Sequence, residues 1–152
     1  MIIAAFDPGL SGAVAVTGAQ TTNSVYDLPT MGAGKQVILN GTALADILAR
    51  VQVKHVVIEH VASMPKQGVA STFKFGTAFG QIIGVVQALG LSHEFVRPNV
   101  WKKALGLSSD KEAARRRAIE LFPGLAVELA RKKDHNRAEA LLLARWWWEA
   151  RG

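Results

Sequence analysis

The chain has 152 residues, of which 49% are hydrophobic and 20% are charged. This composition is typical of globular proteins and excludes disordered and fibrous classes. The length predicts a single domain, residues 1–152, with a core large enough to be stable without disulfide bonds or structural metal ions. There is no cysteine, which excludes disulfides and thiolate metal sites. The formal net charge of +6 favours a polyanionic partner, nucleic acid first.

The positive charge lies mainly in the second half of the chain. The first fifty residues contain only Lys35 and Arg50 as basic side chains. This distribution predicts one basic face on a near-neutral remainder, although solubility alone would also account for the net charge. The later basic residues include Arg97, Lys102, Lys103, Lys111, Arg115, Arg116, Arg117, Arg131, Lys132, Lys133 and Arg137.

No segment of the sequence has the pattern of a leader or a membrane anchor. The N-terminal "MIIAAFDPG" has no basic residues before its apolar run and reaches Asp7 at once, unlike a signal peptide. The longest apolar run, "IIGVVQALGL", is far shorter than the ~20 residues of a membrane helix. We therefore expect no membrane association and a cytoplasmic location, in a bacterium or a phage-infected host.

The first sixty residues predict strands with one intervening helix. Residues 1–7, 12–18 and 23–29 are short apolar runs separated by turn residues, which favours an antiparallel meander of three strands. Residues 41–51 have apolar side chains at helical spacing, with Thr42 as a plausible cap. Residues 55–61 are β-branched and apolar until Glu59, as in a buried central strand.

The rest of the chain is predicted to be mainly helical. The resulting order of elements predicts an α/β fold, a mixed sheet of antiparallel and parallel strands flanked by helices, whose ligand site lies where strands end. A capping box from Ser109 to Glu112 opens one helix, which stops before Pro123. The expected elements are a loop over 62–70, a helix over about 71–89, a strand over 93–98, and helices over 98–107, 109–122 and 135–148.

Two acidic residues stand at expected strand ends. Asp7 closes the first strand and precedes "PGLSG", and Glu59 interrupts the most hydrophobic strand. A buried carboxylate costs several kcal/mol unless it is paired or binds a metal. Asp7 could instead cap a turn, and Glu59 could form a salt bridge or face solvent at the strand end.

A third group of polar residues opens the last helix. His135 and Glu139 are four residues apart and share one face, and Asp134 at the entrance could turn toward it. As a structural alternative to a metal site, these acids could simply stabilise the helix, because negative charges at a helix N-terminus interact favourably with the helix dipole. Oxygen ligands from two strands and one helix are what Mg²⁺ prefers, and two such ions about 4 Å apart can drive phosphodiester cleavage.

The motifs "FDPGLSGAVAV", "VVIEHV", "STFKFGTAFG" and "KKDHNRAEALL" resemble, in this order, those of the RuvC-type Holliday junction resolvases, particularly their short phage forms. The resemblance covers nearly the whole chain. It implies a ribonuclease H-like fold, a homodimer, and nicking of paired strands at a four-way DNA junction with Mg²⁺ or Mn²⁺. By position, Asp7, Glu59 and Glu139 match the family's first-strand, central-strand and C-terminal-helix acids.

The sequence departs from the family at the fourth ligand. Relatives usually have an aspartate, sometimes a histidine, three or four residues before the last acid, where this chain has Asn136 and His135. His135 has the better helical geometry, and an imidazole can ligate a metal or handle the nucleophilic water. Asp134 has the better ligand chemistry for Mg²⁺. We expect both in the site, with His135 nearer the attacking water.

The resemblance also implies a surface for DNA. Lys74, surrounded by phenylalanines in "STFKFGTAFG", would approach a phosphate, unless this is simply a core helix with a snorkelling lysine. The loop with Lys66 would lie near the junction centre, where relatives carry an aromatic wedge; here Val61 and Ala62 stand there, and Met64 is a possible substitute. The expected phosphate contacts are Lys66, Lys74, Lys102, Lys103, Lys111, Arg115, Arg116, Lys132, Lys133 and Arg137.

The run "WWW" at 146–148 turns about 100° per residue, so a single core cannot easily accommodate all three rings. We expect at least one of them to meet a neighbouring subunit or to rest partly exposed.

Three rival functions remain open. "DPGLSG" would also suit a phosphate loop of an actin-like or sugar-kinase-like ATPase, but the second such loop and second domain are missing from this sequence. A non-catalytic junction-binding protein could keep the fold. A ribonuclease H-like nuclease could cut other branched DNA or RNA–DNA hybrids, because acids specify the chemistry and not the shape of the DNA.

Overall fold

The computed structural model describes residues 1–20 and 22–151. Its five-stranded sheet has the order β3-β2-β1-β6-β7. Strand β1 pairs antiparallel with β2 and parallel with β6, which itself pairs parallel with β7. The predicted meander and mixed sheet are therefore confirmed. The strands are β1 (Ile2–Asp7), β2 (Ala13–Gly18), β3 (Ser24–Asp27), β6 (His55–Glu59) and β7 (Ser92–Val96).

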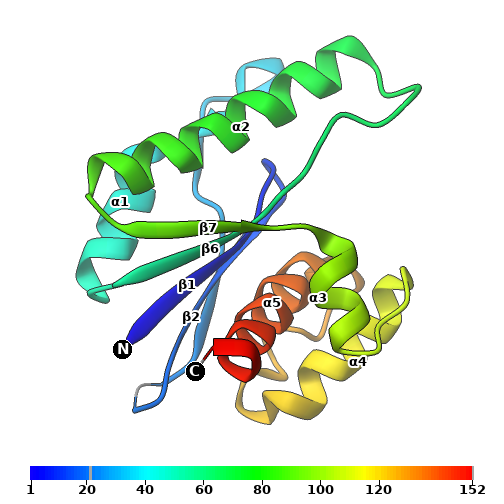
Figure 1. Ribbon diagram of the computed structural model, residues 1–152. Helices are drawn as coiled ribbons and strands as arrows, with labels where there is room; N and C mark the ends of the chain where they lie inside the picture. The colour runs from blue at the N-terminus through cyan, green and yellow to red at the C-terminus, as the bar shows by residue number, and fades with distance from the viewer. Residues whose placement is uncertain (21, 152) are drawn as a thin grey trace.

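Helices cover both faces of this sheet (Figure 1). Helices α1 and α2 lie on one face, and α5 lies on the other together with α3 and α4. The predicted arrangement of a sheet flanked by helices is thus confirmed. The helices are α1 (Gly41–Arg50), α2 (Val69–Ala88), α3 (Pro98–Ala104), α4 (Lys111–Leu121) and α5 (His135–Arg151).

The two acid-bearing strands send alternate side chains into two cores. In β1, Ala4 and Phe6 belong to the core that includes buried residues of α1 and α2, whereas Ile3 and Ala5 belong to the core built around α5. Strand side chains alternate between faces, so Asp7 continues the series of Ile3 and Ala5. The same alternation in β6 places Glu59 with Val57 on the α5 side. Both acids therefore end on the sheet face that α5 covers.

Local details differ from the sequence predictions. Helix α1 is capped by Asn40, whose side chain accepts from the Ala43 amide, and not by Thr42. Helix α4 is capped by Asp110 instead of Ser109, because the Asp110 carboxylate accepts from the Glu112 amide. A small two-stranded sheet of β4 (Thr30–Met31) and β5 (Ile38–Leu39) was not predicted.

Helix α2 agrees with the predicted helix over about 71–89 and begins two residues earlier, at Val69. By length and composition alone it could span a membrane, and this one helix is weak evidence for such a span. Of its own side chains, Ala78, Ile82 and Val86 are buried, whereas Val69 and Phe73 are largely exposed. The helix thus covers the sheet and also presents apolar side chains on its outer surface.

The three consecutive tryptophans belong to α5. Trp146 and Trp147 are buried and Trp148 is partly exposed, in agreement with one of the predicted alternatives. The Trp147 indole donates to Glu94, and the Trp148 indole donates to the hydroxyl of Thr17. These contacts attach the C-terminal half of α5 to β7 and β2.

Candidate active site

Three carboxylates meet where β1 and β6 end and α5 begins. Asp7, Glu59 and Glu139 each offer one oxygen, and these atoms all lie within 4.8 Å of one another. Asp7 is the last residue of β1, Glu59 the last of β6, and Glu139 lies in the second turn of α5. Because β1 and β6 are parallel neighbours, their carboxyl ends share one edge of the sheet. The structure therefore brings together three of the five predicted catalytic residues.

A tight turn connects Asp7 to β2 and holds it against α5. Gly9 has a positive φ of 122°, and a Cβ on Gly12 would lie 2.0 Å from the Asp7 carbonyl oxygen. A larger residue at position 12 would therefore displace the end of β1. The Asn136 side chain donates to the Ser11 carbonyl at 2.6 Å. Asn136, at the predicted fourth-ligand position, thus attaches this turn to the start of α5.

Two of the three acids, Asp7 and Glu59, have raised pKa values. Burial raises the pKa of Asp7 well above its usual range, and the charges of Glu139 and Glu59 add to this effect. Burial also raises the pKa of Glu59, while a hydrogen bond from Trp101 opposes the change. A cluster of oxygen ligands whose charges repel can hold a divalent metal ion, which would offset the repulsion.

Helix α3 supplies a partner to two of the acids. The Trp101 indole donates to Glu59 Oε2 at 2.7 Å, and Lys102 Nζ lies 2.9 Å from Glu139 Oε1. Lys102 was predicted to contact DNA, and the structure places it at the carboxylate cluster. The role of Trp101 was missed, because it lies 42 positions from Glu59 and no local pattern connects them.

Asp134 does not join the three carboxylates. It is buried, and its oxygens accept from the Arg131 backbone amide at 2.8 Å and from the Arg131 guanidinium at 2.9 Å. Burial acts against its ionisation, but the Arg131 hydrogen bonds outweigh burial and hold the pKa of Asp134 below its usual value. These contacts make Asp134 a cap on the turn that precedes α5, and it lies outside the group formed by Asp7, Glu59 and Glu139.

His135 lies beside the cluster and not within it. Its Nδ1 atom is buried without a hydrogen-bond partner among the described residues. Burial and the nearby charge of Lys111 lower the pKa of His135, which favours the neutral imidazole. His135 also lines a polar cleft, together with Ser11, Lys111 and Asn136.

Two of the predicted DNA-contacting arginines are engaged inside the protein. Arg115 contacts Glu112 and donates to the carbonyl oxygens of Leu129 and Ala130 at 2.9 and 3.0 Å. The second arginine, Arg137, donates from two guanidinium nitrogens to the Asp27 carboxylate, at 2.7 and 2.8 Å. Both guanidinium groups connect elements of the fold, so we do not include them in a DNA surface.

The remaining predicted cations are exposed. Lys74 lines a depression formed with the turn after β1 and with Asn136, and Lys111 and Lys133 line the adjoining cleft next to His135. Positive side chains thus flank the carboxylate cluster from α2 and from α4. The exposed cations in this set are Lys66, Lys74, Lys103, Lys111, Arg116, Lys132 and Lys133.

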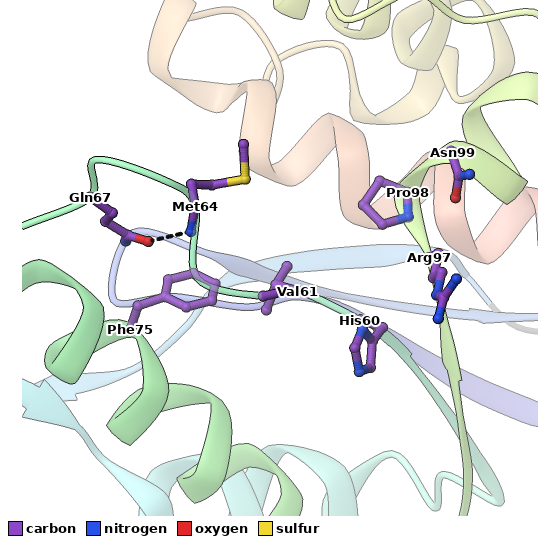
Figure 2. A pocket seen from close by; sticks show the side chains of 9 residues that line it. His60, Val61, Met64, Gln67, Phe75, Arg97, Pro98 and Asn99 are labelled. Atoms are coloured by element: carbon purple, nitrogen blue, oxygen red, sulfur yellow. Dashed lines mark hydrogen bonds between the residues drawn. The ribbon is translucent and has the colours of Figure 1, made fainter.

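A wide, mostly apolar pocket begins directly after Glu59 (Figure 2). Phe75 points into it from α2, the loop after β6 contributes Val61 and Met64, and Arg97 lies at the junction of β7 and α3. The Met64 amide donates to the Gln67 side chain at 3.1 Å, which closes the tip of this loop. Met64 itself is 70% exposed.

Comparison with known proteins relates this arrangement to DNA junction enzymes. No family model matches the chain. It is 32% identical over 154 residues to the crossover junction endodeoxyribonuclease RuvC of Zymomonas mobilis, a match that covers 95% of this chain and 88% of that protein. It is 33% identical over 85 residues to the chloroplastic Holliday junction resolvase MOC1 of Chlamydomonas reinhardtii, covering 55% of this chain but 10% of that protein.

Two solved structures share the fold. The chain aligns with Thermus thermophilus RuvC in complex with a Holliday junction substrate, with a TM-score of 0.67 and 18% identity. A second Thermus thermophilus RuvC structure aligns with a TM-score of 0.62 and 16% identity, and each match covers 99% of this chain and 96% of the other. These similarities confirm the predicted ribonuclease H-like fold.

Proposed function

Because the chain belongs to the RuvC family of crossover junction endodeoxyribonucleases, we propose that it resolves four-way DNA junctions by paired, metal-dependent hydrolytic nicks. The observation that carries this proposal is the meeting of Asp7, Glu59 and Glu139 at one edge of the sheet. The acids of two strands and one helix then form the site, as the family resemblance implied. Residues 1–152 would act as one nuclease domain in the cytoplasm.

We propose that these three carboxylates hold Mg²⁺, in a two-ion site in which Mn²⁺ can substitute. The metal would activate a water molecule and stabilise the leaving oxygen of the phosphodiester. His135, which lines the adjoining polar cleft, would accept a proton from the attacking water.

The exposed cations would bind the phosphates on both sides of this site. Lys74 on α2 would contact the strand from one side, and Lys111 on α4 and Lys133 just before α5 from the other. Lys102, next to Glu139, would face the scissile phosphate. Phosphate contacts predict binding that weakens steeply as the salt concentration rises, with a slope reduced by about one for each lysine removed. Salt-insensitive junction binding would argue against this surface.

Paired nicks require two sites, and we propose that the protein acts as a homodimer. The exposed apolar side chains of Val69 and Phe73 on α2 offer a surface for a second copy. Sedimentation of the wild-type protein and of Phe73→Ser would test the dimer, which the variant should weaken.

The exposed Met64 at the tip of the neighbouring loop would take the place of the family's aromatic wedge at the junction centre.

Cleavage of a panel of DNA substrates tests the function itself. A labelled four-way junction, a linear duplex, a flap and an RNA–DNA hybrid would each be incubated in Mg²⁺, in Mn²⁺ and in EDTA. We expect symmetric paired nicks in the junction alone, and none in EDTA. Cleavage of the flap or hybrid would assign the same metal site to another nuclease activity. Tight junction binding without cleavage would assign the chain to non-catalytic binding.

A further inference from the structure

We infer that Trp101 is a positioning residue of this nuclease site, whose indole N–H fixes the orientation in which Glu59 faces Asp7 and Glu139. The inference rests on the proposed function, since it takes Glu59 as a metal ligand. Its basis is a hydrogen bond of 2.7 Å from Trp101 Nε1 to Glu59 Oε2, between two buried side chains. Trp101 does not approach the reacting atoms itself and acts through Glu59.

The fold places the indole at this position through the pairing of β6 and β7. Glu59 is the register partner of Val96, and the His60 amide donates to the Val96 carbonyl at 2.7 Å. Pro98 opens α3 two residues after β7 ends, which starts the helix at the sheet edge that carries Glu59. Trp101 is fully buried in the core built around α5. Packing therefore holds the indole independently of Glu59.

The chemistry of an indole suits this task. It donates one hydrogen bond, accepts none and carries no charge, so it favours the ionised form of Glu59 without forming an ion pair that a metal would have to break. The last side-chain torsion of a glutamate, χ3, has a broad energy minimum. The hydrogen bond from Trp101 fixes one carboxylate oxygen of Glu59 and so restricts this torsion. The other lone pairs of the carboxylate stay available for a metal. Partners of this kind typically change metal affinity or activity by about 10- to 100-fold.

The substitution Trp101→Phe removes the donor and keeps an aromatic ring in the core. Lys102 Nζ lies 5.2 Å from the Trp101 ring, and a phenyl ring keeps an aromatic face there. The chain provides a matched control in Trp147, which is also buried and donates to Glu94 Oε1 at the same distance of 2.7 Å. Trp147→Phe loses an equivalent hydrogen bond away from the three carboxylates.

Binding of Mn²⁺, followed by the electron paramagnetic resonance signal of the free ion, measures the effect without DNA. We expect Trp101→Phe to raise the Kd for Mn²⁺ by about 10- to 100-fold, and Trp147→Phe to leave it within about twofold of wild type. The pH profile of junction cleavage should also shift, with the acidic limb moving to higher pH in Trp101→Phe alone. A purely structural role would lower the thermal stability of both variants and move neither readout.

A second measurement uses the wild-type protein and does not depend on how a variant folds. In a nuclear magnetic resonance titration with Mg²⁺, the indole N–H resonance of Trp101 should shift, and that of Trp147 should not. A Trp101 resonance that stays in place as Mg²⁺ saturates the site, or a folded Trp101→Phe with wild-type Mn²⁺ affinity, would overturn the inference alone. Wild-type protein that binds no Mn²⁺ would overturn the proposed function as well.

Discussion

Glu94 and Glu59 lie on neighbouring parallel strands, face the same helix, and each accept a hydrogen bond of 2.7 Å from a buried tryptophan. Their other neighbours differ. Glu94 lies 2.6 Å from the Arg151 guanidinium and 3.2 Å from His55 Nε2. Glu59 instead faces two further carboxylates. Helix α5 contributes to both sites, cationic Arg151 at its C-terminal end and anionic Glu139 near its start.

We propose that this difference separates a structural carboxylate, Glu94, from a functional one, Glu59. The donors around Glu94 satisfy its charge, and it connects β7 to the end of α5. At the other site the fold holds three acids together against their mutual repulsion, and burial raises the pKa of Asp7 further. Such an arrangement costs stability in the absence of a cation. A bound metal ion would offset this loss of stability, as the proposed function requires.

The largest expected effect is on cleavage. Glu59→Gln should reduce Mg²⁺-dependent junction cleavage by about 10³-fold or more, because a carboxamide is a poor ligand and several kcal/mol of transition-state stabilisation are lost. Junction binding and thermal stability should be retained. Glu94→Gln, the matched change at the structural site, should cleave at nearly the wild-type rate. Robust Mg²⁺-dependent cleavage by Glu59→Gln would remove Glu59 from the site.

The next effect concerns the pH dependence of metal binding. A carboxylate must lose its proton to bind a metal, and the pKa of Asp7 is raised. The Kd for Mn²⁺ should therefore rise as the pH falls, by about tenfold per pH unit for each proton displaced, beginning above the range of an ordinary aspartate. Calorimetric titrations at several pH values would measure it. A Kd unchanged down to the usual range of aspartate would contradict the raised pKa.

A smaller effect is expected on stability at the structural site. Glu94→Ala leaves the Trp147 indole, Arg151 and His55 without their shared partner. We expect a loss of about 1–3 kcal/mol in the free energy of unfolding, because a buried donor remains unsatisfied. Urea denaturation would measure it, with the exposed Glu149→Ala as a control for loss of charge. A change within the error of that control would show that this network contributes no stability.

The smallest effect has the opposite sign. In EDTA, Asp7→Asn should raise the Tm, by roughly 2–4 °C if about 1 kcal/mol of repulsion is relieved. The sign follows from linkage, because the folded state raises the pKa of Asp7 and so binds its proton more tightly than the unfolded state does. The metal-free wild type should accordingly lose stability as the pH rises through that raised pKa. A lower Tm for Asp7→Asn would show that the acids are not in conflict.

Periodicity and strand-end position were sufficient to predict the main sheet and to single out Asp7 and Glu59. Apolar runs separated by turn residues gave the meander, and Glu59 was conspicuous because it ended a β-branched strand. Parallel pairing of β1 and β6 then brought Asp7 and Glu59 to one edge. The placement of Glu139 followed from the family resemblance.

Side-chain partners could not be predicted in the same way. Asp134 resembled a ligand by position, but the orientation of Arg131 decides its role, and that orientation depends on the turn before α5. Arg115 and Arg137 appeared available for DNA because acceptors that are distant in the sequence or are backbone carbonyls cannot be recognised from the sequence, although Glu112 lies only three residues before Arg115. Trp101 had no signal at all, since its hydrogen bond depends on the packing of α3 against the edge of the sheet.

Crystals grown in Mn²⁺ would test the central claim most directly, through the anomalous scattering of the ion. The account predicts a peak among Asp7, Glu59 and Glu139, at roughly 2.0–2.3 Å from their oxygens, with no ion bound to Asp134. The structural site around Glu94 should bind none and serves as the internal control. The absence of a peak among the three carboxylates at a saturating Mn²⁺ concentration, or an ion held by Asp134 instead, would contradict it.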